Sequence, residues 1–303
     1  MNSDLSVIIL SYNTKEITHH CLQKLDEAKK YCEQKLHNKI EVMVVDNGSQ
    51  DGSPLMIKED HPEVKLLALK ENTGFSRGNN IGMKESKYDF ILLLNSDVYL
   101  EVDSLYKALA YFRVNLNCDV LGCKLKYTDG RLQPSAGNLP NFLNTIFWIM
   151  GISAIPALKR VTHPFHPTLK SFFAKAHQAG WITGAFFMLK REVFEKTQGF
   201  DENLFLYMEE VEWCKRIQDR GFKIWYNPNF EVTHLKAASS DFDPNLALVN
   251  ELKGLKYYFN KHSSIYFLIK IFLILGLILR VITFTLLGKT KRAKAYVDGL
   301  SMI

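Results

Sequence analysis

A short apolar run that ends at a polar cluster constrains the fold of this chain most. Residues 91–94 are consecutive isoleucine and leucine residues, and Asn95, Ser96 and Asp97 follow them directly. Four residues are too few for a helix and suit a strand buried on both faces. Asp97 would then lie at the carboxyl end of a central strand, where open α/β sheets bind ligands. We therefore expect Asp97 to be a metal ligand, although Asn-Ser-Asp taken alone favours an ordinary turn.

The same arrangement recurs along the first half of the chain. Residues 7–10, 40–45, 64–69 and 90–94 are strand-length apolar runs, and a polar loop follows each of them. Between the runs, apolar residues recur at helical spacing, as in residues 17–28. Strands that alternate with helices predict a doubly wound, mostly parallel α/β sheet of Rossmann type. The four polar loops would then lie along one edge of this sheet.

Two of these loops contain side chains suited to a nucleotide or a sugar. Asp46 could accept hydrogen bonds from a ring N–H or a ribose hydroxyl, and it could equally cap the helix near Pro54. Residues 74–80 combine glycines, the cation Arg77 and amides, which suits a phosphate or sugar lying against backbone. This loop matches neither the GxGxxG nor the Walker pattern, so the dinucleotide and ATPase fingerprints are missing.

The second half of the chain predicts further strands and one acidic helix. Strands are expected at residues 120–127, 222–226 and 230–233, and a helix at residues 207–220. Three acidic residues stand near the start of this helix, and compensation of the helix dipole explains two of them. They are Glu209, Glu210 and Glu212.

An apolar segment with three prolines, residues 141–170, interrupts this pattern. It is too short to span a bilayer before Gly151 and Pro156. We expect an excursion that contacts lipid or a hydrophobic acceptor, with burial in the core as the alternative.

The C-terminal part contains a membrane-length apolar segment. Residues 265–287 include only Lys270 and Arg280 as charged side chains. At about 100° per residue, His262, Tyr266, Lys270 and Arg280 fall within one arc of about 80°. This pattern favours a helix lying in the membrane interface with a polar stripe, rather than an isolated span. A buried helix at an oligomer interface, as in a homodimer, is the alternative.

The formal net charge of +6 is unevenly spread, with Lys289, Lys291, Arg292 and Lys294 following the apolar segment. We therefore expect a peripheral or monotopic protein on an anionic membrane surface, at the cytoplasmic face of the inner membrane. Nucleic acid is not an expected partner, because aromatic and basic residues do not interleave. Five scattered cysteines without a CxxC pair indicate a reducing compartment, and an acidic N-terminus without a basic leader predicts no signal peptide.

Taken in order, the motifs resemble the inverting family 2 glycosyltransferases of GT-A fold. The matching stretches are residues 6–13, 44–49, 72–82, 93–97, 184–185, 199–202, 205–214 and 232–234. The resemblance covers about residues 5–240, and residues 126–133 are similar to the rhamnosyltransferase branch. It implies a GT-A domain over residues 1–240 and a helical, membrane-associating region over residues 241–303. Within the domain, residues 1–115 would bind the nucleotide sugar, and residues 116–240, with the apolar insertion 141–170, would form the acceptor and catalytic half.

The resemblance also implies roles for individual residues. Glu210 would be the catalytic base, and Asp97 and His234 would hold a Mg²⁺ or Mn²⁺ ion at the diphosphate. Asn95 stands where the family often has a first Asp, so we expect a weak or substrate-dependent metal site. His234 and Ser239 are spaced like the family's HxxGxS motif, with Ala237 replacing Gly. The implied donor-binding residues are Ser11, Asn13, Asp46, Asn72, Gly74, Arg77, Asn80, Asn95, Ser96 and Gly184.

The implied activity is transfer of L-rhamnose from dTDP-rhamnose onto a lipid-linked or polysaccharide acceptor in bacterial cell-surface glycan synthesis. Such an inverting transfer needs a carboxylate that deprotonates the acceptor hydroxyl, and Glu210 near a helix N-terminus is expected to be ionised. Another donor, namely UDP-galactofuranose, a UDP-N-acetylhexosamine or a GDP-sugar, is an open alternative. A non-catalytic relative that binds glycan or scaffolds a synthase is another.

Overall fold

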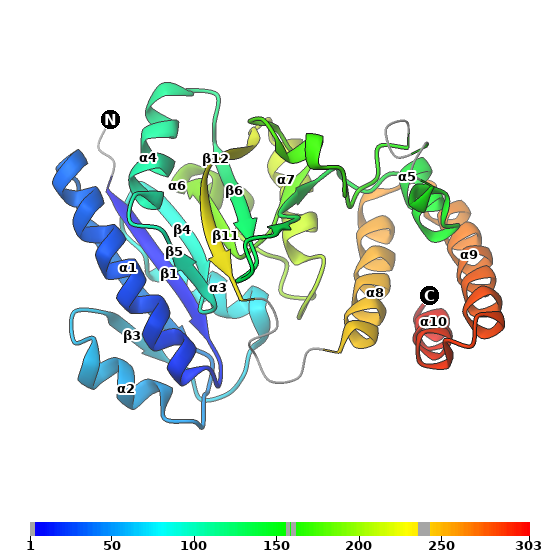
Figure 1. Cartoon of the computed structure of the whole chain (residues 1–303), viewed down its shortest axis with the longest axis horizontal. Helices are drawn as coiled ribbons and strands as arrows, with labels where there is room; N and C mark the ends of the chain where they lie inside the picture. Colours follow the sequence, from blue (N-terminus) through cyan, green and yellow to red (C-terminus); the bar gives the residue numbers. More distant parts are fainter. Residues whose placement is uncertain (1–3, 156–157, 159–161, 236–242) are drawn as a thin grey trace.

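The computed structural model describes residues 4–155, 158, 162–235 and 243–303. Figure 1 shows an α/β body that contains the N-terminus and a group of helices, including the C-terminal ones, beside it. The body is built on a large twisted sheet with helices on both faces.

The strands of the large sheet are β1 (Leu5–Ser11), β2 (Ile40–Asp46), β3 (Lys65–Ala68), β4 (Phe90–Asn95), β5 (Val98–Leu100), β6 (Val120–Lys126), β7 (Leu132–Gln133), β9 (His177–Gln178), β11 (Phe186–Lys190) and β12 (Ile224–His234). A second, two-stranded sheet consists of β8 (Ala136–Gly137) and β10 (Trp181–Ile182). The main strand order is β3-β2-β1-β4-β11-β6-β12-β5.

The sheet is mixed, which corrects the expectation of a mostly parallel one. β1 to β4 form a parallel half, as predicted, but β11 runs antiparallel to both β4 and β6. The chain enters β11 from a short turn after β10 and not from a crossover helix, so a parallel pairing is not required. The two strands predicted near residue 228 are one strand, β12, whose register shifts between Asn227 and Glu231. Pro228, which cannot donate a ladder hydrogen bond, lies in this irregular stretch.

The helices are α1 (Lys15–Leu36), α2 (Ser53–Asp60), α3 (Gly74–Glu85), α4 (Ser104–Val114), α5 (Phe142–Ile149), α6 (Arg191–Thr197), α7 (Glu209–Asp219), α8 (Pro244–His262), α9 (Tyr266–Leu286) and α10 (Thr290–Met302), with 3₁₀ turns η1 (Ile152–Ala154) and η3 (Lys170–Phe173). Alternating side chains of β1 divide the core between the two faces of the sheet. Val7 and Ile9 pack in the cluster that contains Leu22 of α1, and Ile8 packs in the cluster of the opposite face. Burial on both faces explains why residues 7–10 of β1 are an apolar run.

The C-terminal helices belong to the second of these clusters. Leu252 of α8, Leu273 of α9 and Tyr296 of α10 pack in the cluster that contains Ile8. α5 of the apolar excursion packs closely on α9. The helices are so close that a Cβ atom at Gly276 of α9 would lie 2.6 Å from Cγ2 of Ile149 in α5. Figure 1 shows α5, α9 and α10 together at the end of the molecule away from α1 to α3. The proposed division at residue 240 stays a prediction.

One feature of the predicted C-terminal helix is wrong. α8 ends at His262 and α9 begins at Tyr266, so the expected polar stripe does not lie along a single helix. His262 instead faces the α/β body, where its Nε2 lies 3.0 Å from Oε1 of Glu212. By length and composition alone, α9 could cross a membrane.

Candidate active site

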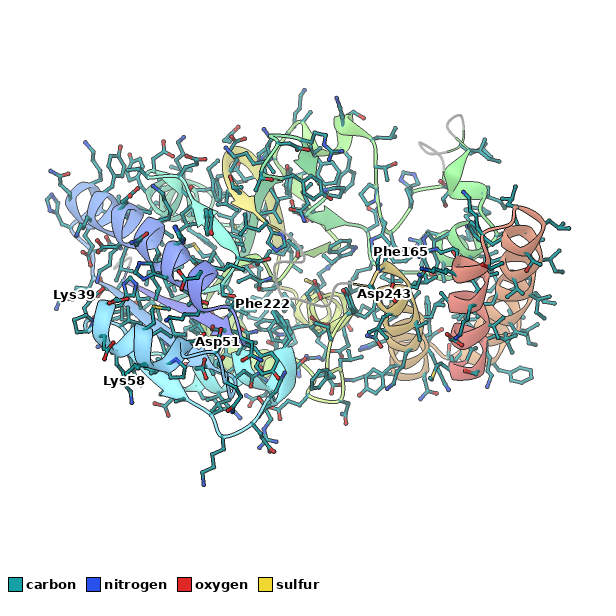
Figure 2. All side chains as sticks on the ribbon, turned by 60° about the horizontal axis from the view of Figure 1, so that its bottom comes forward. Lys39, Asp51, Lys58, Phe165, Phe222 and Asp243 are labelled. Atoms are coloured by element: carbon teal, nitrogen blue, oxygen red, sulfur yellow. The ribbon has the colours of Figure 1, made fainter. Side chains whose placement is uncertain are left out.

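The polar loops at the carboxyl ends of the strands meet at one edge of the sheet, as predicted, and line a cavity of about 900 Å³. The start of α7, the excursion and the C-terminal helices form its other walls. Figure 2 labels Phe165 of the excursion and Asp243, which precedes α8, beside the C-terminal helices. Lys39, Asp51 and Lys58 lie at the other end of the molecule, around α1 and α2. The predicted site residues in its lining are Asn72, Gly74, Asn95, Ser96, Asp97, Gly184, Glu210 and His234.

Asp97 and His234 are brought together from distant parts of the sequence. β12 pairs antiparallel with β5, and this register sets His234 opposite Val98, next to Asp97. Nε2 of His234 lies 3.1 Å from Oδ1 of Asp97, and Nδ1 lies 3.2 Å from Oε1 of Gln133. Both side chains are largely buried, at 12% and 15% exposure. Two groups of metal-ligand type are therefore held face to face.

The pair fits a divalent cation only in part. A carboxylate oxygen and an imidazole nitrogen are both suitable ligands for Mn²⁺, and the carboxylate also suits Mg²⁺. Within the described ranges, no group of three or more His, Cys, Asp or Glu residues is suitably placed to hold a metal ion. A metal bound by Asp97 and His234 would need ligands from substrate phosphates or water, which agrees with the expected substrate-dependent site. Ala237 and Ser239 of the HxxGxS-like motif lie outside the described residues.

The first turn of α7 presents two adjacent carboxyl groups to the cavity. Glu210 accepts hydrogen bonds from the backbone N–H of Gly184 and from the side chain of Glu209. Glu209 is only 4% exposed, and its Oε2 has no hydrogen-bond partner within the described part of the chain. Burial raises the pKa of Glu210, and burial together with the neighbouring Glu210 raises the pKa of Glu209 well above its usual range. Burial therefore favours the protonated form of Glu209, whose carboxyl group lies beside that of Glu210.

Two opposing influences act on the pKa of Glu210. A helix N-terminus favours the ionised carboxylate, and backbone N–H groups act in that direction here. Burial acts in the opposite direction and is the largest single influence on the group. Glu210 is therefore a stronger base than an exposed carboxylate, which suits proton abstraction near neutral pH.

A strained turn holds this carboxyl pair in place. Tyr207 and Met208 both have φ of 71°, in the left-handed region that non-glycine residues rarely adopt. Such residues cost about 1–3 kcal/mol each and persist where the surrounding structure fixes them. Gly254 of α8 packs on this turn so closely that a Cβ atom would lie 2.6 Å from Cβ of Met208. Residues 207–210, which contain the strained turn and the two carboxyl groups, are called the acidic turn below. The position of α8 is thus coupled to the geometry of the acidic turn.

On the opposite side of the cavity, the end of β2 contains an incompletely bonded carboxylate. Asp46 is 1% exposed, and its Oδ1 accepts a hydrogen bond of 2.9 Å from the backbone N–H of Ser49. Its Oδ2 is buried without a hydrogen-bond partner in the described residues. Asp46 itself lies outside the cavity lining, next to Asn47, which belongs to it. The expected contact of Asp46 to a nucleotide stays a prediction, because its unpaired oxygen is buried and lies outside the lining.

Asn72 organises the neighbouring loop. Its Oδ1 accepts hydrogen bonds of 2.9 Å from Nδ2 of Asn47 and from the backbone N–H of Gly74. Gly74 has φ of +83°, and a Cβ atom there would lie 2.6 Å from the ring of Phe205. A side chain at this position would therefore be strained and would displace Phe205.

Ser11 and Asn80 do not have the side-chain exposure that a donor contact requires. The Ser11 hydroxyl is fully buried and lies 3.2 and 3.0 Å from the hydroxyls of Thr14 and Thr18. The Asn80 side chain donates to the backbone oxygen of Phe200 and accepts from its N–H, both at 2.9 Å. Both residues lie outside the cavity lining, so the structure supports a positioning role in place of the expected donor contact.

Asn13 and Arg77 also lie outside the cavity lining. Asn13 joins two loops: its Oδ1 accepts from the N–H of Gln50 at 2.8 Å, and its N–H donates to Ser49 Oγ at 2.9 Å. The Arg77 side chain is 60% exposed, with its Nε 3.9 Å from Oε2 of Glu202. The expected donor contacts of these two side chains stay predictions.

Several residues in the lining are not indicated by any sequence pattern. His166 of the excursion is hydrogen bonded through Nε2 to Oε1 of Glu251 in α8, and both line the cavity near the acidic turn. Arg280 of α9 and Arg292 of α10 line it as well. A lone histidine between prolines forms no pattern that predicts a site. The sequence pattern of the two arginines predicts a membrane surface, not a cavity. Their place in the cavity depends on how the helices pack.

Comparison with known proteins identifies the kind of scaffold. The sequence model described as "Glycosyl transferase family 2" matches residues 6–198. The N-acetylglucosaminyl-diphospho-decaprenol L-rhamnosyltransferase of Mycobacterium tuberculosis is 27% identical over 242 residues, which cover 74% of this chain and 76% of that protein.

Solved structures show the same fold at lower identity. The mannosyltransferase PcManGT from Pyrobaculum calidifontis, in complex with GDP-Man and Mn²⁺, aligns with a TM-score of 0.60 at 16% identity, covering 97% of this chain and 85% of that one. Staphylococcus aureus TarS 1-349 in complex with UDP-GlcNAc aligns with a TM-score of 0.53 at 17% identity, covering 99% and 91%. In a longer TarS structure, the chain covers 44% of the protein.

Proposed function

The chain belongs to glycosyl transferase family 2, and on this premise we propose that it is an inverting glycosyltransferase specific for L-rhamnose. The donor would be dTDP-rhamnose, and the acceptor a lipid-linked or polysaccharide glycan of the bacterial cell surface. The rhamnosyltransferase relative supports this donor. One observation carries the proposal: a single cavity includes the Asp97–His234 pair at the sheet edge and the Glu209–Glu210 pair of α7.

The carboxyl pair accounts for the proton in the reaction. An acceptor hydroxyl transfers its proton to Glu210 as its oxygen forms a bond to the anomeric carbon of the donor sugar. The bond from that carbon to the diphosphate breaks on the opposite face, which inverts the configuration. Asp97 and His234 would hold Mg²⁺ or Mn²⁺, and the bound ion would supply positive charge to the leaving diphosphate. The buried, protonated Glu209 orients Glu210 through their shared hydrogen bond.

We propose further that α9 lies on the anionic cytoplasmic face of the inner membrane. Ile269, Leu273 and Leu277 of α9 are buried against the protein. The opposite side exposes large apolar side chains that a membrane would cover. They are Phe267, Leu268, Ile271, Leu275, Ile278, Leu279, Ile282 and Leu286. A homodimer that buries the same surface is the alternative.

The donor is tested by measuring the hydrolysis of a panel of nucleotide sugars, with and without Mn²⁺. Rhamnose specificity predicts that dTDP-rhamnose is turned over fastest, and that an Asp97→Asn variant loses this activity at low Mn²⁺ concentration. Faster turnover of UDP-galactofuranose, a UDP-N-acetylhexosamine or a GDP-sugar would replace the proposed donor. If no nucleotide sugar is hydrolysed or raises the thermal unfolding temperature, a non-catalytic glycan-binding role would be favoured instead.

A further inference from the structure

The cavity continues past the acidic turn into a region that the donor does not explain. Beyond Glu210, its walls come from α5, α8, α9 and α10. A volume of about 900 Å³ is at the upper end of the roughly 300–1,000 Å³ usual for one small-molecule ligand. If the donor binds at the sheet edge, as the proposed function requires, this region is available to the acceptor.

This region carries two positive charges that form no ion pair with a described carboxylate. Arg280 and Arg292 are the only lysine or arginine residues in the described lining of the cavity. Neither guanidinium forms an ion pair within the described part of the chain. The acidic side chain on this wall, Glu251, is hydrogen bonded to His166. Among the residues that the structure describes, therefore, no carboxylate is paired with either of these two charges.

Neutral groups fix the direction of both guanidinium groups. Arg280 donates from Nε to the backbone oxygen of Ile149 at 2.8 Å, and from Nη2 to that of Trp148 at 2.9 Å. These carbonyls lie at the C-terminal end of α5, where the helix dipole favours a cation. Arg292 donates from Nη1 to the backbone oxygen of Pro244 at 3.2 Å. These contacts leave the charge uncompensated and further N–H donors available.

Such oriented, unpaired arginines favour phosphate groups, which they bind through paired N–H donors. We propose that Arg280 and Arg292 bind the phosphate or diphosphate group of a lipid-linked acceptor. The acceptor hydroxyl would thereby be held near Glu210. Because Arg280 is on the helix whose outer face is apolar, the lipid chain would leave toward the membrane side of α9. This inference rests on the proposed function and narrows its acceptor to a phosphate-bearing lipid.

The test compares two probes with the same hydrocarbon chain, farnesyl diphosphate and farnesol, on the full-length protein in a neutral detergent. Trp148 and Trp181 line the cavity, so tryptophan fluorescence reports binding independently of catalysis. We expect farnesyl diphosphate to bind at least about tenfold more tightly than farnesol. Arg280→Gln and Arg292→Gln should each weaken diphosphate binding on the order of tenfold and leave farnesol binding unchanged.

Lys291→Gln and Lys294→Gln are matched controls, because they remove exposed positive charges of α10 that do not line the cavity. They should bind farnesyl diphosphate like the wild type. If Arg280→Gln unfolds because it loses its contacts to α5, Arg292→Gln still decides the question, since its hydrogen bonds are longer. Equal binding of the two probes, or arginine variants that bind like the wild type, would overturn the proposal.

A second arm separates the acceptor from bilayer lipid as the source of the phosphate. In cosedimentation with phosphatidylglycerol vesicles, the arginine variants should bind as well as the wild type. Loss of vesicle binding with retained farnesyl diphosphate binding would assign the arginines to the membrane surface and refute the proposal. Nucleotide-sugar hydrolysis is measured on the same preparations. Hydrolysis without discrimination between the farnesyl probes would refute this inference alone, whereas absence of hydrolysis would count against the proposed function.

Discussion

Replacing each carboxyl group of the Glu209–Glu210 pair by its amide should separate the base from the residue that orients it. Glu210→Gln removes the group that accepts the acceptor proton. General-base catalysis contributes about 10²–10⁴-fold, so kcat should fall by about that factor, or about 3–5 kcal/mol of transition-state stabilisation. Glu209→Gln replaces the buried, protonated acid by an amide that can still donate a hydrogen bond to Glu210. For this variant kcat should therefore fall by less than about tenfold.

The pH dependence has a defined sign. Because burial raises the pKa of Glu210, kcat should rise with pH through a value above the usual carboxyl range. For Glu209, a raised pKa in the folded state means that its contribution to stability is present at low pH and is lost as pH rises. Glu209→Gln should therefore be more stable relative to wild type at pH 8 than at pH 5.

The assay is steady-state transfer or donor hydrolysis from pH 5 to 9, with thermal unfolding of the same samples. Transfer is scored at saturating donor and Mn²⁺, so that kcat and not binding is compared. If Glu209→Gln loses as much activity as Glu210→Gln while remaining folded, the assignment of the proton within the pair is wrong.

Three further predictions concern the metal, the strained turn and the membrane. Asp97→Asn should raise the Mn²⁺ concentration needed for half-maximal activity. In the wild type, calorimetry should show that Mn²⁺ binds more tightly when nucleotide sugar is present. Equal Mn²⁺ affinity with and without donor would contradict a substrate-dependent site. Gly254→Ala should displace Met208 and reduce kcat by about tenfold or more, since small shifts of catalytic groups are costly, and unchanged kcat would show that the turn tolerates movement. Ile271→Glu with Leu275→Glu should abolish sedimentation with membranes while nucleotide-sugar hydrolysis in detergent is retained, and unchanged sedimentation would exclude this face of α9.

The strands that carry the site could be predicted because their patterns are local. β1, β2 and β4 are buried on both faces, so their sequences are mostly apolar and end where the polar loops begin. This pattern alone placed Asp97 at the functional edge. His234 was reached only through the family resemblance, and its 3.1 Å approach to Asp97 depends on the pairing of β12 with β5.

Residues whose roles depend on tertiary packing could not be assigned in this way. Ser11 ends β1 and Asn80 lies in α3, and their side chains bond to α1 and to the backbone of Phe200. The sequence contains no signal for those partners, since one lies 120 residues away. His166 and Arg280 illustrate the converse, because neither belongs to a motif and both reach the cavity through helix packing.

The packing of the C-terminal helices argues against treating them as a detachable anchor. α8 fixes the strained turn through Gly254, α9 supplies Arg280, and α10 supplies Arg292 to the same cavity. Deletion of residues 264–303 would release a membrane-bound protein, but it would also remove one wall of the cavity and expose Leu252, which a Cβ atom at Gly299 would contact. Loss of activity in such a truncation would therefore not distinguish membrane targeting from acceptor binding. Point substitutions on the outer face of α9 make that distinction, because they leave Arg280 and its contacts to α5 intact.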